Sequence, residues 1–254
     1  MARLPSVFIS HGSPMHALDP GAAGEAWAEL GRRLGKPRAI LIASAHWETN
    51  VPMLTGNPKP ETIHDFSGFP QPLYKLRYPA PGAPDVAQRA QALLKDAAID
   101  GNRGLDHGAW APLLYMYPKA DIPVVQISVQ PAFGPRHHVE VGRSLKKLSE
   151  EGVLIIGSGH MTHNLRDWAR GAGKPQPYAR EFSDWVREKM EKRDLEALAD
   201  YRSLAPHAAR AHPTEEHFLP LFFALGASGH QGNPERIYDG IEGGVLAMDS
   251  YVFH

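Results

Sequence analysis

Histidine follows a short apolar run at three places in this sequence. The three stretches are VFISHGS (7–13), LIASAHW (41–47) and LIIGSGHMTH (154–163). They place His11, His46 and the pair His160 and His163 just after residues that favour a buried strand. Neutral imidazole is a good ligand for Zn and Fe. Because the chain contains no cysteine, a histidine cluster here indicates a catalytic metal site rather than a structural thiolate site.

The elements that carry these histidines have the pattern of a parallel sheet. Residues 5–10 and 38–45 are rich in Val, Ile and Leu, and an amphipathic helical pattern at 22–34 lies between them, as in a βαβ unit. Ligands of open α/β sheets bind outside the carboxyl ends of the strands. A single histidine at a strand end is more often an ordinary interior residue. Three of them favour a shared site, at which we expect His11, His46 and His163 to converge.

The remaining patterns continue the alternation of strand and helix. They predict strands at 124–129 and 153–158, a hairpin or strand pair through 236–253, and helices at 85–99, 110–117, 137–152, 178–193 and 214–226. We therefore expect an α/β fold in which 1–254 form a single domain, with a mainly parallel or mixed central sheet flanked by helices. The segment 58–84 holds seven prolines, and loops of this length are usually functional or disordered.

Composition excludes several classes of partner. The chain has 254 residues, with 27 basic and 28 acidic residues, so no basic surface for nucleic acid or an anionic membrane is indicated. No apolar stretch approaches the roughly 20 residues that cross a bilayer, and the N-terminus lacks the features of a signal peptide. We expect a cytoplasmic protein. The histidines His137, His138 and His254 lie in polar or terminal contexts, where we expect them to be solvated.

Several motifs together resemble one enzyme family. They are HGSPM (11–15), SAHW (44–47), TIHDFSGFPQPLY (62–74), YPAPG (78–82), DHGAW (106–110), THNL (162–165) and PTEEHFLPL (213–221). In this order they resemble the bacterial 4,5-DOPA dioxygenase family of LigB-type, class III extradiol ring-cleavage dioxygenases. The resemblance implies that His11, His46 and His217 bind the metal. It also implies that His163 is a catalytic histidine or a fourth residue close to the metal, and that His107 faces the substrate.

The activity implied by this resemblance is extradiol cleavage of a substituted catechol, DOPA-like or caffeate-like, by O2 to a muconic semialdehyde. One divalent metal ion is expected, Fe(II) for turnover, with Zn(II) as a possible bound ion. Glu216 is another possible ligand, and Phe66, Phe69 and Tyr74 could form an aromatic wall or simply pack within their loop. Two alternatives stay open: a zinc-dependent hydrolase that uses the same histidines, and a non-catalytic metal- or ligand-binding module. The sequence does not predict the oligomeric state.

Overall fold

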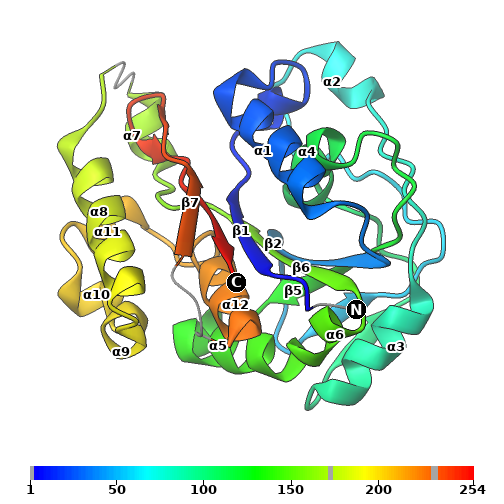
Figure 1. Ribbon diagram of the computed structural model, residues 1–254. Helices are drawn as coiled ribbons and strands as arrows, with labels where there is room; N and C mark the ends of the chain where they lie inside the picture. The colour runs from blue at the N-terminus through cyan, green and yellow to red at the C-terminus, as the bar shows by residue number, and fades with distance from the viewer. Residues whose placement is uncertain (1–2, 171–173, 230–233) are drawn as a thin grey trace.

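In a computed structural model that describes residues 3–170, 174–229 and 234–254, helices cover both faces of an eight-stranded sheet (Figure 1). The strands are β1 (Ser6–Ser10), β2 (Ala39–Glu48), β3 (Met53–Thr55), β4 (Ala98–Asp100), β5 (Val124–Val129), β6 (Val153–Gly159), β7 (Pro234–Tyr238) and β10 (Ser250–Phe253), with a separate pair β8 (Ile241–Glu242) and β9 (Leu246–Ala247). The helices are α1 (Gly21–Leu34), α2 (Gln71–Lys75), α3 (Pro84–Leu93), α4 (His107–Met116), α5 (Gly134–Leu145), α6 (Lys147–Glu150), α7 (Leu165–Ala169), α8 (Pro177–Glu191), α9 (Leu195–Ala199), α10 (Tyr201–Leu204), α11 (Ala208–Ala211) and α12 (Leu219–Ser228). None of the described helices is long and apolar enough to span a membrane.

The centre of the sheet is parallel and its margins are mixed. The strand order is β4-β3-β5-β2-β6-β1-β10-β7, and the four strands β5, β2, β6 and β1 run parallel to one another. Antiparallel pairing begins where β3 meets β5 and where β10 meets β1. Because the carboxyl ends of the parallel strands lie at one edge, the loops that follow them share one space. The predicted α/β fold with a mainly parallel or mixed sheet is confirmed.

Three of the central strands, β5, β2 and β6, contribute side chains to two separate apolar cores. Ile40 and Ile42 of β2 belong to the core that includes Trp27 of α1, whereas Leu41 belongs to the core that includes Leu145 of α5. This follows from the alternation of side chains along a strand. Figure 1 shows α1 and α4 on one side of the sheet and α5 and α6 on the other. Burial on both faces explains why the strand sequences are continuously apolar.

Most predicted elements lie where the patterns placed them, and two predictions need correction. The helix predicted at 85–99 ends at Leu93, and 98–100 instead form the edge strand β4, which pairs with β3. Asp96, with a left-handed φ of 57°, turns the chain between them. The helix predicted from residue 214 begins only at Leu219. Pro220 lies in its first turn, where a backbone N–H would have no acceptor within the helix, so that the N–H that proline lacks is not needed.

The prediction that His138 is solvated is wrong, because this side chain is 2% exposed. Its Nε2 accepts a hydrogen bond from the backbone N–H of Gln130 (3.0 Å), and its Nδ1 donates to the carbonyl of Gly134 (2.7 Å). Burial lowers the pKa of His138 to about 3. It is a neutral core residue that joins the end of β5 to α5. His254 is exposed as expected, and His137 is half-buried against Gln130.

Glycines allow α12 to lie very close to its neighbours. A Cβ atom at Gly142 of α5 would lie 2.0 Å from the carbonyl oxygen of Phe223, and one at Gly226 of α12 would lie 2.1 Å from that of Val139. At the end of β6, a Cβ at Gly159 would lie 2.1 Å from the carbonyl oxygen of His217. Any larger residue at these positions forces the backbones apart. These contacts therefore fix the helix that follows His217.

Gly226→Ala should destabilise the protein, because the added methyl group must displace the backbone of α5. Overpacking of this kind costs about 1–3 kcal/mol of unfolding free energy. Gly101→Ala is the matched control, since a Cβ there meets no atom within 4 Å. Urea unfolding of both variants measures the difference. Equal stability of the two variants would contradict the close α5–α12 contact.

Candidate active site and metal centre

The loops at the carboxyl ends of β1, β2 and β6 hold the histidines in place. His11 follows β1 directly, and its N–H donates to the carbonyl of Gly159 at the end of β6 (3.0 Å). His160 follows β6, and its N–H donates to the carbonyl of His217 (2.7 Å). His46 lies near the end of β2, where the regular pairing with β5 breaks after Ala43. Backbone hydrogen bonds thus connect the segments that carry the imidazoles.

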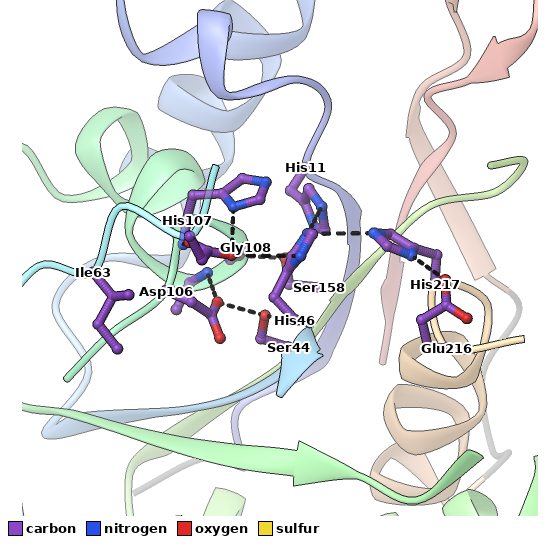
Figure 2. A network of polar contacts seen from close by, with 12 residues as sticks. His11, Ser44, His46, Ile63, Asp106, His107, Gly108, Ser158, Glu216 and His217 are labelled. Carbon is purple, nitrogen blue, oxygen red and sulfur yellow. Dashed lines mark hydrogen bonds and ion pairs between the residues drawn. The ribbon is translucent and has the colours of Figure 1, made fainter. Parts of the chain in front are cut away.

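Three imidazoles point toward one another (Figure 2). The Nε2 atom of His46 lies 3.0 Å from Nε2 of His11 and 3.3 Å from Nε2 of His217. Ligands bound at about 2.0–2.1 Å to one ion, in tetrahedral or octahedral geometry, are separated by roughly 2.9–3.4 Å. These two distances are those of neighbouring ligands around a single metal ion, and ligand atoms of all three histidines lie within 4.8 Å of one another.

Hydrogen bonds determine the tautomers of His11 and His217. The hydroxyl of Ser158 donates to the carbonyl of Gly108, so its oxygen accepts a hydrogen bond from Nδ1–H of His11 (3.0 Å). Nδ1–H of His217 donates to Oε1 of Glu216 (2.9 Å). A neutral imidazole carries one proton, so Nε2 of each ring holds a free lone pair. The carboxylate and hydroxyl partners orient both rings for metal binding.

The third ring, His46, is arranged in the same way. Its Nδ1 lies 3.5 Å from Oδ2 of Asp65, which favours the proton on that nitrogen and leaves Nε2 unprotonated. Three lone pairs then face one another with no hydrogen between them. A divalent cation would replace this repulsion by three bonds, so the residues present fit a metal ion.

Burial keeps these imidazoles neutral. Desolvation and the neighbouring histidines, His160 first, lower the pKa of His11 well below its ordinary value. Desolvation and His163 do the same for His217, and desolvation and His107 lower the pKa of His46 to about 3. Metal binding requires the unprotonated ring. The cluster is therefore ready to bind a cation throughout the neutral pH range.

Asp65 orients a further histidine beside the cluster. Nδ1–H of His107 donates to Oδ2 of Asp65 (2.8 Å), and the backbone N–H of His107 donates to Oδ1 (2.9 Å). Burial alone would raise the pKa of Asp65, but the hydrogen bonds from His107 lower it to about 2. The ring of His107 lies 4.0 Å from that of His46 and keeps Nε2 as an acceptor. Asp106, the neighbour of His107 in sequence, binds Ser44 and Gln126 instead.

His163 lies against the cluster in a different way. Its ring stacks on that of His217, with centroids 3.5 Å apart and planes 12° from parallel. Its backbone N–H donates to the carbonyl of Ala211 (2.8 Å), while its ring has no hydrogen-bond partner among the described residues. Desolvation, together with His46 and His107, lowers its pKa to about 3. A neutral imidazole whose ring nitrogens have no hydrogen-bond partner among the described residues can form a hydrogen bond with a ligand.

All of these rings line one cavity of about 590 Å³, a volume typical of small-molecule sites. Its lining residues are His11, Gly12, Ser13, Pro14, Met15, His46, Phe66, Phe69, His107, His160, His163, Leu165, Trp168, His217 and Leu246. Phe66 and Phe69, from the proline-rich segment, belong to the wall. Tyr74 does not line the cavity, but its ring lies 5.4 Å from that of Phe66. An aromatic ligand can thus lie between aromatic side chains and the histidine cluster.

Comparison with known proteins identifies the family. Residues 5–246 match the family described as the catalytic LigB subunit of aromatic ring-opening dioxygenase. The chain therefore belongs to this family, and its enzyme class is that of the extradiol ring-opening dioxygenases.

Relatives and a solved structure agree over almost the whole chain. A 4,5-DOPA dioxygenase extradiol of Beta vulgaris is 43% identical, over 97% of this chain and 95% of its own. One of Escherichia coli K12 is 40% identical, over 97% and 93%. A crystal structure of an uncharacterized protein from Escherichia coli K12 superimposes with a TM-score of 0.84, at 34% identity, over 99% of this chain and 100% of that one. The resemblance predicted from the motifs is confirmed.

Glu216→Gln should weaken metal binding while leaving the three candidate histidine ligands in place. The amide accepts a weaker hydrogen bond from Nδ1–H of His217, and loss of such a partner typically lowers metal affinity about 10–100-fold. The matched control is Glu215→Gln, because the carboxylate of Glu215 binds Tyr201 and Arg202 rather than a histidine ring. Competition with a chromogenic chelator measures both affinities. Identical affinities for the two variants would show that Glu216 does not support a metal ligand.

Proposed function

We propose that this protein opens the ring of a substituted catechol beside its two hydroxyl groups, with O2, to give a muconic semialdehyde. The observation that carries the proposal is the convergence of three unprotonated Nε2 atoms on the wall of an aromatic cavity. His11, His46 and His217 would hold one divalent metal ion. Fe(II) would support turnover, and Zn(II) could occupy the same nitrogens.

A ferrous ion held by these histidines would supply open coordination positions for the substrate and the redox chemistry that lets a catechol react with O2. The protein orients the ring of the substrate. Phe66 and Phe69 flank the cavity, and their mutual distance of 5.3 Å between centroids makes them one continuous aromatic surface. A catechol whose hydroxyl groups point toward the three candidate ligands would place its ring against Phe66 and Phe69.

Two histidines would handle the protons. His163 faces the cavity with no hydrogen bond to its ring from the described residues, and the negative charge of a bound catecholate would raise its lowered pKa, so that it could accept a proton from the substrate and return it later. His107, oriented by Asp65, presents a second acceptor and would bind the substrate from the other side of His46. Ring opening consumes one O2 and retains both oxygen atoms in the product, so no external reductant is needed.

The relatives support a substrate with a short side chain. Several of them are named 4,5-DOPA dioxygenase extradiol, which suggests DOPA-like or caffeate-like catechols for this chain. We further propose that 1–254 form one catalytic domain, because the matches extend over nearly its full length. Family membership favours this function over a zinc hydrolase or a non-catalytic binding module.

Oxygen consumption tests the proposal against both alternatives. The Fe(II)-loaded protein should consume one O2 per 4-methylcatechol and produce a yellow, ring-opened aldehyde, whereas the metal-free protein should not. The monomethyl ether of the same catechol should be inert, because it cannot bind through two oxygens. Equal turnover of the ether would contradict bidentate binding. Ester hydrolysis without oxygen uptake by the Zn(II)-loaded protein would support the hydrolase instead.

Single-residue variants separate metal binding from proton transfer. His11→Ala should copurify with little metal, since two remaining imidazoles hold a divalent ion poorly. His163→Ala should retain most of its metal but lose roughly 10²–10⁴-fold in single-turnover rate, the usual contribution of a general acid–base group. The control is His207→Ala, because that exposed residue pairs with Glu181 outside the cavity. Complete metal loss from His163→Ala would make His163 a ligand and leave His107 as the proton acceptor.

A further inference from the structure

We propose that Asp106 is a positioning residue that fixes His46, a candidate metal ligand, relative to His107, the candidate substrate-binding histidine. This inference rests on the proposed function and concerns how that site is held in shape. Asp106 is 0% exposed and is not among the residues that line the cavity. Its carboxylate lies beside Ser44 of β2, behind the histidine cluster (Figure 2).

The carboxylate of Asp106 accepts four hydrogen bonds from different parts of the chain. Oδ1 accepts from the hydroxyl of Ser44 (2.6 Å) and from the backbone N–H of Ala109 (3.3 Å). Oδ2 accepts from the side-chain amide of Gln126 on β5 and from Nη2 of Arg103 (3.2 Å). Burial raises the pKa of Asp106, but every one of these partners donates, which favours the ionised carboxylate. A buried charge with this many donors is held in one position.

Ser44 passes this constraint to His46. Its hydroxyl donates to Asp106, and its oxygen accepts a hydrogen bond from the backbone N–H of His46 (3.2 Å). The regular pairing of β2 with β5 is interrupted between Ala43 and Glu48, and His46 lies within this interruption. The serine therefore supports the backbone of the candidate ligand at the place where pairing with β5 is irregular.

The first turn of α4 carries the same constraint to His107. Asp106 is the N-cap of α4, and His107 is the first residue of the helix. The next residue, Gly108, packs directly on β2, because a Cβ atom there would lie 2.5 Å from Oγ of Ser44 and 3.0 Å from Cδ2 of His46. A capped and closely packed turn leaves His107 little freedom to move. A shift of Asp106 would thus change how the rings of His46 and His107 face each other.

Arg103 connects the carboxylate to His46 by a second route. Its guanidinium group, which binds Asp106, also lies over the ring of Trp47, 4.4 Å from the ring centroid. A cation in this position is attracted by the face of the indole. Trp47 directly follows His46 and is 7% exposed. The network around Asp106 therefore contacts the chain on both sides of the candidate ligand.

Two buried serine variants separate positioning from plain stability. Ser44→Ala removes the hydroxyl between Asp106 and His46. The matched control is Ser6→Ala, because Ser6 begins β1, is 2% exposed and donates one hydrogen bond to the carbonyl of Ala224 (2.8 Å). Each variant loses a buried hydroxyl, so both should lower the midpoint of thermal unfolding by about 2–4 °C.

Binding of Co(II) is the readout that a merely structural role would leave unchanged. Competition with a chromogenic chelator gives the affinity, and the visible absorption of bound Co(II) reports the arrangement of its ligands. Ser44→Ala should lower the affinity about 10–100-fold and change the spectrum, whereas Ser6→Ala should match the unmodified protein. With saturating Fe(II) and 4-methylcatechol, Ser44→Ala should also lose about 10²-fold in kcat with a much smaller change in KM, because misplaced groups bind the substrate but align it poorly.

An exchange of carboxylate and amide tests Asp106 itself. Asp106→Asn places an N–H group opposite at least one of the four donors, so the Co(II) affinity should fall at least as far as in Ser44→Ala. Adding Gln126→Glu returns a carboxylate to the same pair of residues and restores their match of donor and acceptor. The double variant should therefore regain about tenfold or more of the lost affinity. If either Asp106 variant is unfolded, Ser44→Ala still decides the question.

Either of two results would overturn the inference while the proposed function stands. The first is a Ser44→Ala protein whose Co(II) affinity, spectrum and kcat equal those of Ser6→Ala. The second is a folded double variant that regains the thermal midpoint of the unmodified protein without regaining Co(II) affinity. Failure of the unmodified protein to bind one Co(II) ion, or to consume O2 when loaded with iron, would overturn the proposed function itself.

Discussion

The mutual approach of three unprotonated imidazole nitrogens is the constraint on which the rest of the site depends. Lone pairs at 3.0–3.3 Å repel unless a cation lies between them, and no single element can bring them together. The parallel strands supply the common edge, the oxygen partners of Nδ1 select the tautomer, and burial prevents protonation. Removal of any one of these conditions would leave histidines in a cavity without the geometry of a metal site.

Close packing of the backbone supplies the remaining precision. His217 belongs to a turn rather than a strand end, and it reaches the cluster only because Gly157 and Gly159 leave room for that turn against β6. A Cβ at Gly157 would lie 2.0 Å from the carbonyl oxygen of Pro220. The stability of the α12 contacts and the position of one candidate ligand are therefore linked. The same loops also build the apolar wall, so metal and substrate sites share one scaffold.

The strand-end pattern was enough to predict the sheet and the meeting of His11 with His46, because burial on both faces and the common carboxyl edge are encoded locally. The position of His217, beside acidic residues at the start of an apolar helix, made it a weak candidate, and its role as a metal ligand was implied only by the family resemblance. The pairing of Asp65 with His107 spans 42 positions, and the sequence favoured no particular partner for either. His138 is buried because its ring on α5 accepts a hydrogen bond from the backbone of Gln130, which follows β5. Composition does not reveal this contact. Contacts that depend on tertiary packing are those that sequence reasoning missed.

The most direct test of this account is an anomalous-scattering map of crystals grown with the metal-loaded protein. One peak should lie within about 2.0–2.2 Å of Nε2 of His11, His46 and His217, the usual bond length for imidazole ligands. His46, Asp65 and His107 form a competing group whose ligand atoms also lie within 4.8 Å of one another. A metal peak at that group, or no peak near the three Nε2 atoms, would contradict the central claim.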